Sequence, residues 1–225
     1  MKTLLAIIIT ATLSFGCAIL ESEQTTVVSG GGGIKSAPST SVPAVTSWSG
    51  TKQFGTSSPD HAYGIATDPG GNVYVTGHTN GGLDGNTNAG SSDLFVVKYD
   101  SGGIKQWVQQ FGTSSLDHAY GISTDTSGNV YVTGHTNGGL DGNTNAGSDD
   151  LFVVKYDSEG IKQWVRQFGS SSYDYAQGIA TDTSGNVYVT GVTRGGLGGN
   201  TNVGSDDLFG LHWRTILHHR QYYFC

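Results

Sequence analysis

Residues 54–110 read FGTSSPDHAYGIATDPGGNVYVTGHTNGGLDGNTNAGSSDLFVVKYDSGGIKQWVQQ, and the residues from 111 onward repeat this stretch almost word for word. Equivalent positions return every 57 residues, as in the sets Phe54, Phe111, Phe168 and Gly64, Gly121, Gly178. A period of this size is typical of arrayed units that bury apolar surface against their neighbours. The sequence therefore predicts a repeat array, and it is far less informative about the biochemical role.

Each repeat has the pattern of four short strands. The second strand, NVYVTG, occurs three times and places Val73 and Val75 on one face and Tyr74 and Thr76 on the other. The third, DLFVVKYD, has a continuous apolar centre that suits a strand covered on both sides. The first strand is expected at residues 63–67, 120–124 and 177–181, the third at 93–100 and 150–157, and the fourth in KQWVQQFG and KQWVRQFG. Four antiparallel strands joined by tight turns form one twisted sheet, and a repeated sheet of this kind is a propeller blade.

The four phrases GNVYVTG, LDGNTNAG, DLFVVKYD and KQWVQQFG resemble the SBBP family of bacterial β-propeller repeats, which is found in exported proteins and many predicted lipoproteins. The resemblance covers residues 54 to about 209. It implies an all-β fold of four-stranded antiparallel blades. It implies no reaction, because the family has no shared catalytic residues to carry over.

Composition limits the partners. Charged residues make up 13% of the 225 residues, 36 residues are glycine, and the formal net charge is -7. Lys and Arg occur as scattered single residues, so nucleic acid and anionic membrane surfaces are poor partners.

The first 47 residues have the pattern of an export signal and a spacer. Residues 1–17 combine Lys2, an apolar run and the small Gly16 before Cys17, which predicts a signal peptide. Two alternatives stay open: cleavage by ordinary signal peptidase near Ala18, or a lipobox-like FGC in which Cys17 is lipidated and becomes the first mature residue. Residues 18–47 are rich in Ser, Gly and Thr and predict a flexible linker. We expect an exported protein held at the cell envelope by a lipid on Cys17, at the outer membrane or the cell surface.

The repeat pattern breaks off near the C-terminus. Residues 48–209 hold about 2.5 blades, and after GSDDLF the expected VVKYD is replaced by the non-repeat tail 210–225. We therefore expect the third blade to lose the rest of its third strand and all of its fourth. Closed propellers have about 4 to 8 blades, so the array is expected to be incomplete, with exposed blade edges that favour self-association. A frameshift in an ancestral longer propeller would explain the tail, and the leading TSWSGTKQFG resembles a fourth strand.

The loop NGGLDGNTNAGSS is the strongest candidate for a metal site. Asp84, Asn86 and Asn88 have the i, i+2, i+4 spacing of an oxygen-rich calcium loop, and Asp93 could complete the shell. The copy in the next repeat consists of Asp141, Asn143, Asn145 and Asp150. Phe95 stands where a bidentate Glu is needed. The alternative is that Asp and Asn form turns here and tolerate left-handed backbone, with Leu83, Leu140 and Leu197 anchoring the loops.

The histidines and large aromatics recur with the repeat. His61, His78, His118 and His135 are interpreted as surface residues of the repeat, because Tyr175 and Val192 replace them in the third copy. His212, His218 and His219 lie in the tail without Cys or carboxylate partners at ligand spacing. Trp107, Trp164, Tyr99 and Tyr156 are expected to pack between adjacent sheets.

No catalytic residue is predicted, because the candidate groups either repeat in each unit or are missing from the third, whereas catalysis needs a unique constellation. We expect a non-enzymatic binding or structural module without a certain cofactor, whose ligand is a protein or a glycan bound by the repeated loops. The alternative is a fragment of a propeller hydrolase or lyase that acts on extracellular polymers.

Overall fold

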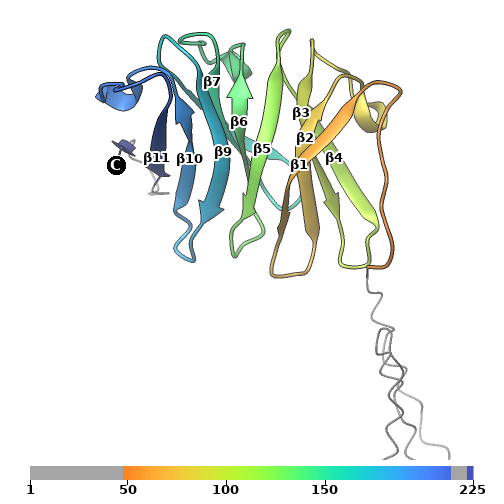
Figure 1. Cartoon of the computed structure of the whole chain (residues 1–225). Helices are drawn as coiled ribbons and strands as arrows, with labels where there is room; N and C mark the ends of the chain where they lie inside the picture. Colours follow the sequence, from red (N-terminus) through yellow and green to blue (C-terminus); the bar gives the residue numbers. More distant parts are fainter. Residues whose placement is uncertain (1–47, 214–221, 225) are drawn as a thin grey trace, which may run out of the picture. The chain divides into compact units, whose positions relative to one another are not determined.

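The computed structural model describes residues 48–213 and 222–224, which form three four-stranded antiparallel sheets (Figure 1). The first blade consists of β1 (Asp60–Thr67), β2 (Val73–Thr79), β3 (Asp93–Tyr99) and β4 (Lys105–Phe111). The second consists of β5 (Asp117–Thr124), β6 (Val130–Thr136), β7 (Asp150–Tyr156) and β8 (Lys162–Phe168). The third consists of β9 (Asp174–Thr181), β10 (Val187–Thr193), β11 (Asp207–Trp213) and β12 (Tyr222–Phe224). The predicted all-β fold of propeller-type blades is confirmed.

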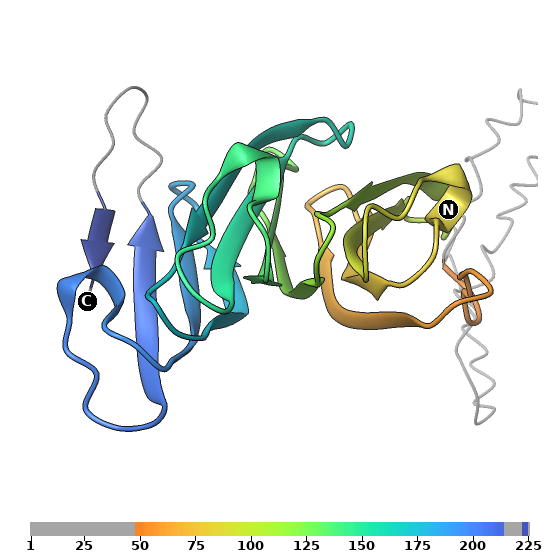
Figure 2. The same cartoon turned by 90° about the horizontal axis from the view of Figure 1, so that it is seen from above.

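Within each blade the strands lie in chain order, and the first strands β1, β5 and β9 lie beside one another (Figures 1 and 2). These inner strands begin earlier than the sequence predicts. His61 pairs with His78 and Ala62 with Gly77, and a β-bulge lies at Tyr63, the residue at which the strand is expected to start. The bulge inserts one unpaired residue, so the ladder continues although the apolar alternation does not. The second blade has the same feature, because β5 carries a β-bulge between Ala119 and Gly121.

Apolar side chains between the blades form the core. Ile122 of the second blade lies over Gly64 of the first, where a Cβ on Gly64 would come within 3.1 Å of the isoleucine Cγ2. Ile179 lies over Gly121 in the same way, at 3.2 Å. The third strands β3 and β7 are buried on both faces, as predicted. Tyr156, Trp107 and Trp164 contribute to the clusters between sheets, which confirms their predicted packing role, whereas Tyr99 packs against Trp48 of the leading segment.

The links between blades are fixed by buried carboxylates. Asp117 is fully buried and accepts hydrogen bonds from the Thr136 hydroxyl and from the backbone amide and hydroxyl of Thr113. Asp60 and Asp174 have equivalent partners in the other two blades. Because a buried carboxylate without donors is costly, this arrangement sets where each inner strand begins.

The leading segment, residues 48–56, covers the outer side of the first blade, in the position of a preceding blade's fourth strand. Trp48 packs on Gly103 as Trp107 packs on Gly160. Lys105 lies 4.2 Å from the centroid of the Phe54 ring, and the matching lysine in the second blade lies 3.9 Å from Phe111. The sequence similarity of this piece to a fourth strand therefore corresponds to a similar placement.

The third blade is more complete than expected. β11 pairs with β10 along its whole length, up to Val187 with Trp213, so the expected loss of half of this strand is wrong. A β ladder needs backbone groups rather than particular side chains. The non-repeat residues also keep the alternation, because Leu211 is buried where the repeat has Val154. The short β12 pairs with Leu211, His212 and Trp213 and supplies a fourth strand of three residues.

Candidate functional site

Five rings form a continuous row across the inner strands, which we call the ring ladder: His61, His78, His118, His135 and Tyr175. They come from β1, β2, β5, β6 and β9, so all three blades contribute. Successive ring centroids are 5.0, 3.8, 5.2 and 4.4 Å apart. The closest pair, His78 and His118, stacks face to face across the first blade junction with an interplanar angle of 16°.

Two tyrosines, Tyr63 and Tyr120, pack along the ladder, and Tyr63 is exposed to solvent. Tyr63 lies 5.5 Å from His78 and 5.1 Å from Tyr120, and Tyr120 lies 5.5 Å from His135. Tyr63, the bulge residue of β1, is 53% exposed. A pocket of about 580 Å³ lies between these rings. Its lining consists of Tyr63, His118, Tyr120, His135, Tyr175 and Gln177.

Three imidazoles of the ladder, those of His78, His118 and His135, are held in the neutral form. Burial, together with the neighbouring imidazoles, lowers the pKa of His78, His118 and His135 to about 4. Desolvation disfavours the charged form, and neighbouring imidazoles would repel one another once protonated. At neutral pH the ladder therefore offers uncharged rings with N–H and hydroxyl groups at their edges.

Each blade junction carries one hydrogen bond from the ladder to the preceding blade. Ser92 Oγ lies 2.8 Å from His118 Nε2, and in the next repeat the Tyr175 hydroxyl donates to Asp149 at 2.7 Å. Ser92 and Asp149 occupy equivalent positions, as do His118 and Tyr175. Burial raises the pKa of the Tyr175 hydroxyl, and the bond to Asp149 raises it further. The hydrogen bond between these two positions is thus present at both junctions, although both residues differ between the repeats.

The interpretation of the histidines as surface residues is wrong for His78 and His135, which are each only 8% exposed. The ring of His118 stacks on His78 and the ring of Tyr175 packs against His135, so side chains of the next blade cover both imidazoles. Only His61 is well exposed. The sequence contains one signal of this arrangement. Ser92 and His118, which are 26 residues apart, are both replaced in the next repeat, by Asp149 and Tyr175.

The candidate calcium residues make local contacts. Asp84 has left-handed backbone, with φ 53°, and its carboxylate pairs with Lys105 at 2.6 Å. Asn86 donates to the Leu83 carbonyl, and Asn88 donates to the carbonyls of Asn80 and Gly90. The second loop repeats this with Asp141, Asn143 and Asn145.

Asp93 and Asp150 are used in hydrogen bonds to the end of each loop and to the fourth strand. Asp93 accepts from the Ala89 amide and from Gln110, and Asp150 has the matching partners Ala146 and Gln167. In the part of the chain that the structure describes, no three His, Cys, Asp or Glu side chains gather as a metal site. The buried Leu83, Leu140 and Leu197 anchor the loops as predicted. Calcium binding stays a prediction, and the geometry is that of turns.

Cys17, His218 and His219 lie outside the described residues. Among residues 48–213 and 222–224, no helix has the length and apolar character needed to cross a bilayer.

Comparison with protein families supports the blade assignment. A model described as a beta-propeller repeat, SBBP, matches residues 50–84, 106–141 and 163–199, and each match covers the first two strands of one blade. The chain belongs to the SBBP β-propeller repeat family. Each match begins before the inner strand and ends in the loop after the second strand, so it includes the residues of the ring ladder.

Two curated proteins are similar to these SBBP repeats. The regulatory protein FlaEY of Caulobacter vibrioides is 28% identical over 161 residues, which cover 65% of this chain and 16% of that protein. An uncharacterized WD repeat-containing protein, L264, of Acanthamoeba polyphaga mimivirus is 28% identical over 127 residues, or 49% of this chain and 9% of the relative. The chain thus spans less than a fifth of the length of either relative.

Proposed function

We propose that this SBBP-repeat chain is a non-enzymatic binding module that is exported and anchored at the cell envelope through Cys17. Its β-propeller repeats and its similarity to a regulatory and a WD repeat-containing protein are consistent with a binding or structural role. The anchor rests on the sequence of residues 1–17 alone.

The pocket between the rings of the ladder supports the proposal that the chain binds a ligand. A solvent-exposed pocket lined by aromatic rings with a few polar edge groups is the usual form of a small-ligand site. Because His118 and His135 are neutral, the pocket suits an uncharged ligand better than an ion. A sugar ring has this chemistry, since its C–H face packs on tyrosine and its hydroxyls bond to Gln177, imidazole nitrogen or phenol. We therefore propose a neutral glycan as the ligand.

A glycan array followed by titration calorimetry on the full chain tests this proposal. Tyr63→Ala removes an exposed ring, so binding should weaken at least about tenfold while the melting temperature is unchanged. Ile104→Ala is the matched control, because Ile104 is similarly exposed but lies in the turn before β4. Absence of binding to any neutral glycan contradicts the ligand class. Turnover of a bound glycan would instead favour the propeller hydrolase or lyase.

The anchor has its own test. Wild-type protein should partition into detergent and incorporate labelled fatty acid, and Cys17→Ser should abolish both. A mature chain that begins at any residue other than Cys17 contradicts lipidation but leaves the binding proposal intact.

A further inference from the structure

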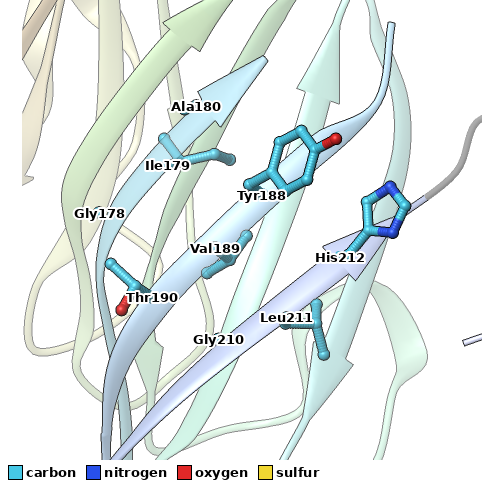
Figure 3. A pocket seen from close by; sticks show the side chains of 9 residues that line it. All are labelled: Gly178, Ile179, Ala180, Tyr188, Val189, Thr190, Gly210, Leu211 and His212. Atoms are coloured by element: carbon cyan, nitrogen blue, oxygen red, sulfur yellow. The ribbon is translucent and has the colours of Figure 1, made fainter. Parts of the chain in front are cut away.

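One face of the third blade, whose groove-lining residues are drawn in Figure 3, is open, whereas the equivalent face of the other two blades is buried. Leu94 and Leu151 are fully buried by the following blade, whereas the equivalent Leu208 is 88% exposed. A groove of about 600 Å³ runs over β9, β10 and β11 on this face. Its lining includes Gly178, Ala180, Thr190 and Gly210. The third blade therefore presents the surface that elsewhere in this molecule receives a blade.

The opposite end of the array presents the matching surface. Ile122 and Ile179 each insert over the glycine of the preceding blade, Gly64 or Gly121. Their equivalent in the first blade, Ile65, is 70% exposed. Gly178, the equivalent of the two covered glycines, has only Thr190 of its own blade within 4 Å of an added Cβ. In the described residues, Ile65 of the first blade therefore has no glycine of a preceding blade to cover, and Gly178 of the third blade has no isoleucine over it.

Strand pairing offers a second, independent match. Within the complete first blade, Phe111 of the fourth strand β4 pairs with Leu94 of the third strand β3. In the third blade, β12 pairs only with residues 211–213, which leaves the edge of β11 at Leu208 without a paired strand among the described residues. The leading segment already holds Phe54 against the first blade as Phe111 is held against the second. If the first blade of a second chain docked on β11, its Phe54 would lie beside Leu208, as Phe111 lies beside Leu94 in the first blade.

We propose that two copies of this chain associate head to tail, with the first blade of each on the third blade of the other. The two junctions repeat the geometry of the internal ones, because Ile65 enters the site over the partner's Gly178 and residues 52–54 pair with the part of the partner's β11 that β12 leaves free, residues 208–210. The three blades formed by residues 48–213 and 222–224 give six blades in two copies, which lies within the 4 to 8 of closed propellers. A two-fold arrangement closes the ring and leaves neither face exposed.

Native mass spectrometry and light scattering on the full chain over a concentration series test this assembly. We expect twice the 23.5 kDa of one chain. Ile65→Asp places a charge in the apolar junction, and Gly178→Val fills the site, so each should weaken association at least about tenfold. Circular dichroism of both variants should match the wild type, because neither position has a packed neighbour from another blade. Ile104→Asp is the control, since its equivalent Ile161 stays 63% exposed within the array.

A cysteine pair tests the orientation. With Cys17 and Cys225 replaced by serine, a chain carrying Ile65→Cys and Gly178→Cys should form a covalent dimer under oxidation, and neither single variant should do so at comparable yield. A wild-type monomer at all concentrations, a dimer that both Ile65→Asp and Gly178→Val leave intact, or an open series of larger species would overturn the closed six-blade pair.

Discussion

Mild acid should destabilise the array through the ring ladder. Burial and the neighbouring imidazoles lower the pKa of His78, His118 and His135 to about 4, whereas an imidazole in the unfolded chain titrates near 6.5. Between these two values the unfolded chain binds more protons than the folded one. Stability is therefore full above about pH 6.5 and falls as the pH drops toward 4.

The magnitude follows from these two values. At pH 5 an imidazole is almost fully protonated in the unfolded chain and only about one tenth protonated in the fold, which costs about 2 kcal/mol of unfolding free energy relative to pH 7. Because neighbouring imidazoles lower one another's pKa, their losses do not simply add, and the three groups together cost a few kcal/mol, which is a large part of the stability of an ordinary domain.

Urea unfolding monitored by tryptophan fluorescence at pH 5, 6 and 7 measures this loss. His78→Val and His135→Val copy the residue that the chain has at position 192, and each should reduce the difference between pH 7 and pH 5 by about 2 kcal/mol. Val153→Ala is the control, because it opens a cavity in the core without removing a titratable group. It should lower stability equally at all three values.

Carboxyl groups near the ladder oppose this effect only weakly. Burial raises the pKa of Asp117 and Asp149 above 3.8, so their protonation favours the fold as the pH falls. These groups are present in all variants, so the differences between variants isolate the imidazoles. A pH dependence that is the same in wild type, His78→Val and His135→Val would refute the argument that buried neutral imidazoles control acid stability.

Three further predictions concern the repeat itself, each checked by urea unfolding at pH 7. Gly121→Val should cost about 1 to 3 kcal/mol, because its side chain would collide with Ile179 in a filled junction. Asp84→Gly should change stability by less than about 1 kcal/mol, since loss of a surface ion pair is offset by relief of left-handed backbone; a large loss would contradict this. Thr136→Val should cost about 1 to 3 kcal/mol by removing a donor to buried Asp117, and equal stability would contradict that role.

Most of the blade architecture could be predicted because it depends on local pattern. The alternation of NVYVTG and the apolar DLFVV define β2 and β3, and turn signals such as DPGGN separate them. The early start of β1 could not be predicted, because the residues before Tyr63 lack apolar alternation and are paired across a bulge. The full length of β11 was missed because side-chain similarity ends at Phe209, whereas the backbone ladder continues to Trp213.

The ring ladder could not be predicted from any single repeat, because its contacts join different blades. His78 and His118 are 40 residues apart and belong to no motif, yet their rings stack at 3.8 Å. Comparing the repeats for their differences, rather than their shared phrases, would have shown part of it. Where Ser92 becomes Asp149, His118 becomes Tyr175, and the hydrogen bond between the two positions is kept.

The same comparison separates packing from binding. Positions that only pack, such as Leu94 and Leu151, keep their residue type from blade to blade, because each fills an equivalent junction. One ladder position changes from imidazole in His61 and His118 to phenol in Tyr175, and the other changes from imidazole in His78 and His135 to Val192, yet rings meet across both junctions. A site that needed one fixed proton carrier or metal ligand in each blade would not tolerate that exchange, whereas a surface that offers uncharged rings to a neutral ligand does. The variation therefore favours recognition by stacked rings over chemistry at the imidazoles.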